Sequence, residues 1–156
     1  MNPSQAGGLN HTMTERDEAL EIWLAAQAGA LGLDLDTLAP ASADASFRRY
    51  FRVNAKAGTL IVMDAPPEHE NLPAFLKVDA LMAAAGVNVP RILAADECLG
   101  FAILSDLGRE TYLDVINEGN AARLMDAATS ALVRWQLASR PGVLPPYDRA
   151  VLMREL

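Results

Sequence analysis

Two pairs of apolar and β-branched runs, each divided by a polar turn, constrain the fold of this chain more than any other feature. The first pair is Phe47–Val53 with Thr59–Met63, and the second is Val89–Leu93 with Phe101–Leu104. Runs of this kind, separated by a few turn-forming residues, pair as β-hairpins. Two hairpins that share an apolar face complete an antiparallel sheet. We therefore predict a small antiparallel sheet at the centre of the chain.

Helical patterns precede and divide these hairpins. Thr14 stands before an acidic first turn and apolar residues at helical spacing, which predicts a capped helix to about Leu31. We expect a turn over residues 32–40. A second apolar helical face covers Leu72–Ala85, and Gly86 ends it as a helix C-cap. The expected order is helix, two strands, helix, two strands, which is an α+β fold.

The pattern becomes helical throughout after Thr111. We predict a short helix over Tyr112–Ile116, a long one over Ala121–Ser139 and a third that begins at Asp148 and runs to Leu156. The third helix carries no stop signal, so we expect the polypeptide to continue into further helices.

Bulk composition excludes several function classes. A net charge of -7 and a pI near 4.7 argue against a nucleic-acid or anionic-membrane partner, because phosphate-rich surfaces select clustered Lys and Arg. The single cysteine, Cys98, allows no internal disulfide and no cysteine-based metal cluster. No apolar run approaches the length that spans a bilayer. We predict a cytoplasmic protein in a reducing compartment, with no membrane partner.

Four short motifs, in chain order, resemble those of a known family: Asp44–Arg52, Val62–Pro67, Val89–Leu93 and Leu104–Gly108. With the expected strands and helices between them, they resemble the aminoglycoside phosphotransferase family, whose fold is protein-kinase-like. Within that family they are most similar to the bacterial cell-wall sugar kinases that phosphorylate the anomeric hydroxyl of N-acetylmuramate and N-acetylglucosamine. The resemblance spans roughly residues 38–156 and implies ATP, Mg2+ and a small sugar-like acceptor.

The resemblance also implies a division of the chain. A flexible N-terminus, 1–13, precedes a kinase-like nucleotide-binding lobe over 14–108, in which a helix crosses the antiparallel sheet. Residues 109–156 then form the first helices of an incomplete helical C-lobe. The family's catalytic base and magnesium ligands are expected beyond residue 156, in the missing C-terminal lobe, since no His-x-Asp-x-x-x-x-Asn loop occurs here. We expect no catalytic or metal-binding residue in this chain, which is predicted to be inactive alone.

The phosphate-binding loop of the family corresponds to residues 42–46, a run of small residues that includes Asp44 and Ser46. Small residues let backbone amides approach phosphate oxygens, although this run lacks the glycines that kinases use. Asp44 and Ser46 are therefore assigned to the nucleotide site.

Side chains alternate along the strand that follows, so Arg48, Tyr50 and Arg52 share one face. If Tyr50 lies over the adenine, Arg48 is nearer to the phosphates, and we take it as the preferred phosphate contact. The alternative is that Arg48, Arg49 and Arg52 are solvated strand residues, as exposed hairpins often carry.

Kinase-like folds place a lysine on their third strand, where this chain has Met63 followed by Asp64. Ile61 and Met63 are assigned to the nucleotide site, but neither supplies a cation. The cation is then expected from the next helix, at Lys77, for which the alternative is a solvent-facing surface lysine. Asp64 either caps the end of the hairpin or orients Arg48.

The segment Leu104–Gly108 resembles the hinge of the family, where main-chain N–H and C=O groups pair with the adenine edge. Leu104, Ser105, Asp106 and Leu107 are the residues assigned to this contact. The Asp-Leu-Gly at 106–108 is not the magnesium-binding Asp-Phe-Gly of kinases, because no catalytic loop precedes it.

The sequence alone allows two functions. The first is the ATP-binding portion of a small-molecule phosphotransferase that phosphorylates a sugar hydroxyl, such as that of an amino sugar in cell-wall recycling. The second is a non-catalytic kinase-like binding or interaction module, which the absence of the strand lysine favours.

Overall fold

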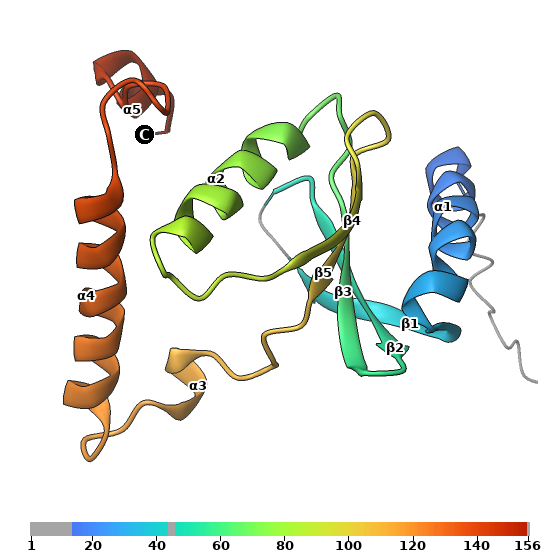
Figure 1. The fold of residues 1–156 in the computed structure, drawn as a ribbon, viewed down its shortest axis with the longest axis horizontal. Coiled ribbons are helices and arrows are strands. Elements are labelled where there is room, and N and C mark those ends of the chain that lie inside the picture. Colours follow the sequence, from blue (N-terminus) through green and yellow to red (C-terminus); the bar gives the residue numbers. More distant parts are fainter. Residues whose placement is uncertain (1–13, 44–45, 156) are drawn as a thin grey trace, which may run out of the picture. The chain divides into compact units, whose positions relative to one another are not determined.

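The computed structural model describes residues 14–43 and 46–155, with the side chains of 42, 43, 154 and 155 excepted. Its helices and strands follow one another along the chain as Figure 1 shows, and their bounds are α1 Glu15–Leu31, β1 Leu33–Ala43, β2 Arg49–Ala55, β3 Gly58–Asp64, α2 Leu72–Ala84, β4 Ile92–Asp96, β5 Phe101–Ser105, α3 Tyr112–Val115, α4 Ala121–Ala138 and α5 Arg149–Glu155. The predicted fold class is confirmed: this is an α+β fold with the antiparallel sheet of a kinase-like N-lobe.

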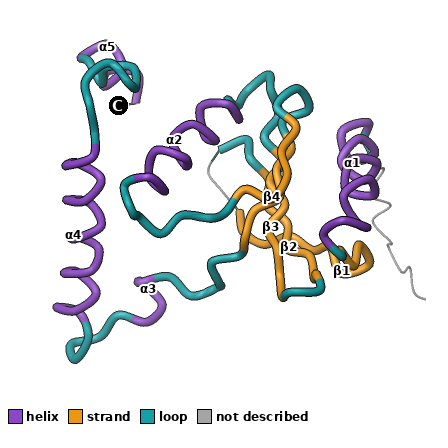
Figure 2. Tube along the Cα trace, in the orientation of Figure 1, coloured by secondary structure: helices purple, strands orange, loops and turns teal. Residues whose placement is uncertain are grey.

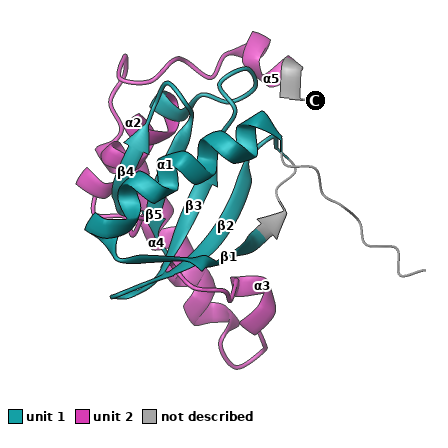
Figure 3. Cartoon of the chain, turned by 90° about the vertical axis from the view of Figure 1, so that its right-hand side faces the viewer, with its two compact units in different colours: residues 1–73, 91–106 teal, residues 74–90, 107–156 magenta. Residues whose placement is uncertain are grey.

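The chain divides into two compact units (Figure 3). The first consists of residues 1–73 and 91–106, and it contains α1 and all five strands of the sheet. The second consists of residues 74–90 and 107–156, and it contains most of α2 together with α3, α4 and α5. The loop that follows Asp106 connects β5 to α3, and Figure 2 draws it without helix or strand.

The five strands form one antiparallel sheet in the order β1-β2-β3-β5-β4. Both predicted hairpins are present. The first turns at Lys56 and Ala57, between β2 and β3, and the second connects β4 to β5 through residues 97–100. Because β5 pairs with β3, the two hairpins lie side by side and share the same core.

The prediction of a turn over residues 32–40 is wrong, because this segment lies in β1. Leu33 and Leu35 pack against the core while Asp34 and Asp36 are exposed, which is the alternation of a half-buried strand. This alternation is present in the sequence, but Pro40, a residue that is unusual within strands, favoured the prediction of a turn. Proline is tolerated here because β1 is an edge strand, and the register with β2 shifts between Pro40 and Ser42.

One face of the sheet is covered by α1, which appears as the blue helix beside the strands in Figure 1. The helix begins at Thr14 with a reciprocal capping box to Asp17, and it ends at Gly32, whose φ of 65° is left-handed. Trp23 packs on Phe101 with ring centroids 5.6 Å apart. The other members of this buried core are Leu20, Leu24, Val53, Val62 and Ile103.

The second unit is held by contacts between α2, α4 and the loop after α4. Arg134 of α4 donates from Nη1 to the carbonyl of Gly86 at 2.7 Å, and Lys77 of α2 donates from Nζ to the carbonyl of Val143 at 2.7 Å. A largely apolar cavity of about 880 Å³ lies between them, beside Leu81 and Trp135. Among the described helices, none is both long and apolar enough to cross a membrane.

Candidate nucleotide-binding site

The sheet face opposite α1 brings together residues that the sequence assigned to a nucleotide. Side chains alternate along a strand, so the residues that precede and follow the core residues in sequence point to the sheet face opposite α1. The register aligns these positions in two rows across β2, β3 and β5. One row is Tyr50, Met63 and Ala102, and the other is Arg52, Ile61 and Leu104. The prediction that Tyr50 and Arg52 share a face with each other is therefore confirmed, while nucleotide contact stays a prediction.

Burial separates the members of this face. Met63 is fully buried and Leu104 is 4% exposed, so both contribute packing. Tyr50 and Ile61 are half-buried and accessible in part. A buried methionine offers no cation, so any charge for a phosphate has to come from another residue.

Arg48, the preferred phosphate contact, is half-buried and paired with Glu70, with Nε and Oε2 2.7 Å apart. Burial lowers the pKa of Arg48, but hydrogen bonds with Tyr50 and Glu70 outweigh this and raise the pKa above its ordinary value. The main-chain N–H of Arg48 also donates to Oγ of Ser46 at 3.2 Å. The alternative of a freely solvated Arg48 is wrong.

Arg52 forms a fork with Asp106, the residue that follows β5. Its Nε donates to one carboxylate oxygen at 2.6 Å and its Nη2 to the other at 3.1 Å, while Thr59 donates to the same carboxylate at 2.6 Å. Bidentate pairs of this kind fix orientation as well as charge. The hydrogen bond with Asp106 also raises the pKa of Arg52. The side chain of Asp106 therefore anchors the predicted hinge to β2 and β3.

Ser105, also a residue of the predicted hinge, exchanges two hydrogen bonds with Arg91, which directly precedes β4. Its N–H donates to the carbonyl of Arg91 at 2.9 Å, and its Oγ accepts from the N–H of Arg91 at 2.8 Å. The N–H of Ser105 is therefore not available to an adenine edge. Leu107 is 60% exposed.

Asp64, at the end of β3, is fully buried on the α1 side of the sheet. Its two carboxylate oxygens accept from Nε of Arg16 at 2.8 Å and from Nε of Arg49 at 2.7 Å. Arg49 reaches Asp17 of α1 as well, at 2.7 Å. Both interpretations of Asp64 from the sequence, a hairpin cap or a partner of Arg48, are wrong. The side chain of Arg49 is 40% exposed, so it is partly solvated, but it also connects the sheet to α1.

A model of the phosphotransferase enzyme family (APH) matches residues 37–156. The chain belongs to this family.

Three curated relatives of this chain are named N-acetylmuramate/N-acetylglucosamine kinase. The protein of Pseudomonas aeruginosa is 58% identical over 119 residues, which cover 76% of this chain and 35% of the relative. That of Pseudomonas putida is 43% identical over 154 residues, covering 92% and 45%, and that of Neisseria meningitidis is 46% identical over 121 residues, covering 74% and 36%. This chain therefore spans less than half the length of the relatives it matches.

Phosphotransferases need cations for the phosphates and ligands for a metal, and the described residues meet these needs unequally. Arginines fit the first need, because Arg48 and Arg52 are fixed by carboxylates on the sheet face opposite α1. Magnesium does not fit, since the described part of the chain holds no group of three or more His, Cys, Asp or Glu side chains arranged for a metal ion. Lys77 belongs to the second unit and binds Val143 there, and Asp44 lies outside the described residues.

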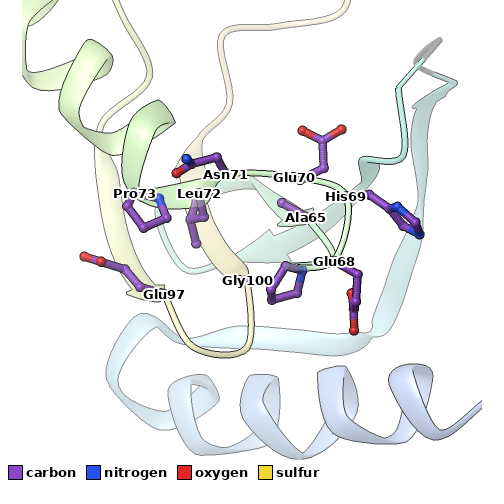
Figure 4. Close-up of a pocket in the computed structure, with 10 residues that line it drawn as sticks. Ala65, Glu68, His69, Glu70, Asn71, Leu72, Pro73, Glu97 and Gly100 are labelled. Carbon is purple, nitrogen blue, oxygen red and sulfur yellow. The ribbon is translucent and has the colours of Figure 1, made fainter. Parts of the chain in front are cut away.

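Beside the end of β3, a cavity of about 470 Å³ is formed by the turn at 66–71 and by the residues around Gly100 (Figure 4). Three carboxylates line it, those of Glu68, Glu70 and Glu97. Like charges repel, so this cavity does not suit a phosphate. Figure 4 shows Glu68 and Glu70 on opposite sides of the turn. Glu70, which the sequence did not single out, is the residue that connects this turn to Arg48.

Proposed function

We propose that this chain supplies the ATP-binding part of a phosphotransferase that transfers the γ-phosphate of ATP to a sugar hydroxyl. One observation carries the proposal. In a chain of the phosphotransferase family, the sheet face opposite α1 holds an aromatic ring, Tyr50, together with Arg52 of the same strand, and Arg48 directly precedes that strand. Carboxylates fix the guanidinium groups of both arginines.

Each of these residues has a task in phosphoryl transfer, which depends on positioning and charge neutralisation. The ring of Tyr50 and the apolar Ile61 offer a surface to the adenine. The main chain at Asp106 and Leu107 offers hydrogen bonds to its edge. Arg48 directly precedes β2, next to the 42–46 segment in the sequence, and meets the phosphates. The base and the magnesium ligands are expected outside residues 1–156.

The names of the relatives support an amino-sugar acceptor. Curated proteins at 43% to 58% identity are named for N-acetylmuramate and N-acetylglucosamine, and both sugars are components of the bacterial cell wall. We therefore propose an amino-sugar kinase of cell-wall recycling. ATP as the phosphate donor and the single exposed cysteine both agree with a cytoplasmic location.

Buried Met63, in place of the strand lysine, favours a second candidate, a kinase-like module that binds a ligand without transfer. One experiment separates the two. The complete gene product is incubated with Mg-ATP and a panel of N-acetylmuramate, N-acetylglucosamine, choline and an aminoglycoside, and phosphate transfer is measured. We expect transfer to the two amino sugars. Nucleotide binding without transfer to any acceptor would establish the module instead, and no nucleotide binding would defeat both.

A pair of arginine variants tests the location of the nucleotide. Arg48→Ala should weaken ATP binding by about tenfold, a typical effect of losing a charge-assisted hydrogen bond. Arg149→Ala changes an exposed arginine of α5 and should leave binding unchanged. Isothermal titration with ATP checks both, and equal losses would show that folding rather than phosphate contact is being measured.

A further inference from the structure

Two consecutive residues before β2 are tethered to two consecutive residues of the turn after β3. The ring of Phe47 stacks on His69, with centroids 4.2 Å apart and an angle of 20° between the planes. The neighbouring Arg48 pairs with the neighbouring Glu70 at 2.7 Å. These two contacts join segments 22 residues apart, and both lie within the first unit.

The turn that provides these contacts is itself rigidly held. Pro66 and Pro67 restrict its backbone, and the carbonyl of Pro66 accepts from the N–H of His69 at 2.9 Å and of Glu70 at 2.8 Å. Just before it, the N–H of Ala65 donates to the carbonyl of Gly100 at 2.8 Å. The approach is so close that a Cβ on Gly100 would lie 2.0 Å from the carbonyl oxygen of Ala65. The turn is therefore fixed to the β4–β5 connection, and it can serve as a firm support.

Glu70 holds Arg48 from a nearly buried position. The side chain of Glu70 is 10% exposed and that of Arg48 is 27% exposed, so the pair is sheltered without being closed to solvent. A hydrogen bond with Tyr50 also raises the pKa of Arg48. A guanidinium carries five N–H donors, more than one carboxylate can use, so an arginine paired in this way can still meet a phosphate.

We propose that residues 66–70 form a strap that positions Arg48 for the phosphates of the nucleotide, with Glu70 as the positioning residue and His69 as the second tether. The inference rests on the proposed function, since it assigns a supporting residue to the same site. A free arginine loses much of its rotamer freedom when it is fixed on a ligand, whereas the strap has fixed Arg48 beforehand. Preorganisation of this kind raises affinity without adding a contact to the ligand.

ATP titrations of the complete protein test the strap. Glu70→Gln should weaken ATP binding by about five- to tenfold, and His69→Ala by a smaller factor, because each loosens one tether. Glu68→Gln is the matched control, since Glu68 belongs to the same turn but lies on its other side (Figure 4), and it should bind ATP as the wild type does. In an Arg48→Ala background, Glu70→Gln should have no further effect, because Glu70 acts through Arg48.

Two outcomes would overturn the strap while the proposed function stands. One is ATP binding by Glu70→Gln that equals or exceeds that of the wild type, which would mean that Glu70 competes with the phosphates or is irrelevant to them. The other is a Glu70→Gln loss of the same size with and without Arg48.

A measurement without nucleotide separates this inference from the proposed function. Hydrogen exchange at the amides of residues 46–48 should be faster in Glu70→Gln and in His69→Ala than in the wild type and in Glu68→Gln. If the wild type fails to bind ATP, the proposed function fails, and the strap as a support for Arg48 is judged by this exchange. Unchanged exchange at these amides would overturn it.

Discussion

The two faces of the sheet use arginine in opposite ways. On the α1 face, one fully buried carboxylate, that of Asp64, accepts from two guanidinium groups. On the other face each guanidinium has its own carboxylate, Glu70 for Arg48 and Asp106 for Arg52. The first arrangement joins a helix to the sheet and contributes to stability. The second holds two cations in place beside Tyr50, which is what a site for an anion requires.

The largest effect is expected on the α1 face. Asp64→Asn removes a buried charge from between Arg16 and Arg49 and should lower the free energy of unfolding by about 3 kcal/mol, the scale for breaking a buried ion pair. Asp34→Asn, on the exposed side of edge strand β1, is the control and should change stability by less than about 0.5 kcal/mol. Urea denaturation of both variants measures the difference. Equal losses of unfolding free energy in the two variants would contradict the stabilising role assigned to the ion pairs of the α1 face.

A smaller loss is expected at the hinge. Asp106→Asn keeps the shape of the side chain but weakens the fork with Arg52 and the bond from Thr59, and it should cost about 2 kcal/mol, less than Asp64→Asn because only one guanidinium loses its partner. Thr59→Val removes only the hydrogen bond from Thr59 to Asp106 and should lower the free energy of unfolding by about 1 kcal/mol. Thermal unfolding followed by circular dichroism checks the order. A larger loss for Thr59→Val than for Asp106→Asn would contradict the fork.

The smallest effect depends on pH. Hydrogen bonds from Thr14 and Arg49 lower the pKa of Asp17 from 3.8 to about 2. A carboxyl group with a lowered pKa stabilises the folded state fully above its unfolded pKa, and the contribution is lost as the pH falls through the folded value. Asp17→Asn should therefore be less stable than the wild type by about 1 kcal/mol at neutral pH, with the gap closing between about pH 4 and pH 2.

A neighbour on the same helix turn controls for this pH dependence. Glu18 is exposed in the first turn of α1, and Glu18→Gln should follow the wild type across the whole pH range. Urea midpoints measured at intervals from pH 2 to pH 7 compare the three proteins. A constant gap between Asp17→Asn and the wild type at all pH values would contradict the role assigned to the carboxylate.

Most of the fold could be predicted from patterns among residues that are close in the sequence. The capping box at Thr14 located the start of α1, and the turn between β2 and β3 was evident from polar residues between two apolar runs. Asp148, whose carboxylate caps α5 at the N–H of Val151, was also recognised. These features succeed because each depends on residues three or four apart. Strand β1 was not predicted because two local signals conflicted. The alternation that begins at Leu33 favours a strand, whereas Pro40 favours a turn.

The ion pairs could not be predicted, because they join distant residues. Arg16 and Asp64 are 48 positions apart, and Arg52 and Asp106 are 54 apart. Strand alternation indicated which arginines share a face, but the choice of carboxylate depends on the register of β2, β3 and β5 and on where the loops return. That is why Glu70 was overlooked and why neither interpretation of Asp64 was right.

The position of α1 has a practical consequence for anyone who shortens this protein for expression. The recognisable family segment begins at residue 37, inside β1, and so excludes the helix. A polypeptide started there would lose Arg16 and Trp23, expose Phe101 to water and leave Asp64 with half of its guanidinium partners. The cooperative folding unit is thus larger than the segment that its relatives make easy to recognise, and trimming should stop before Thr14.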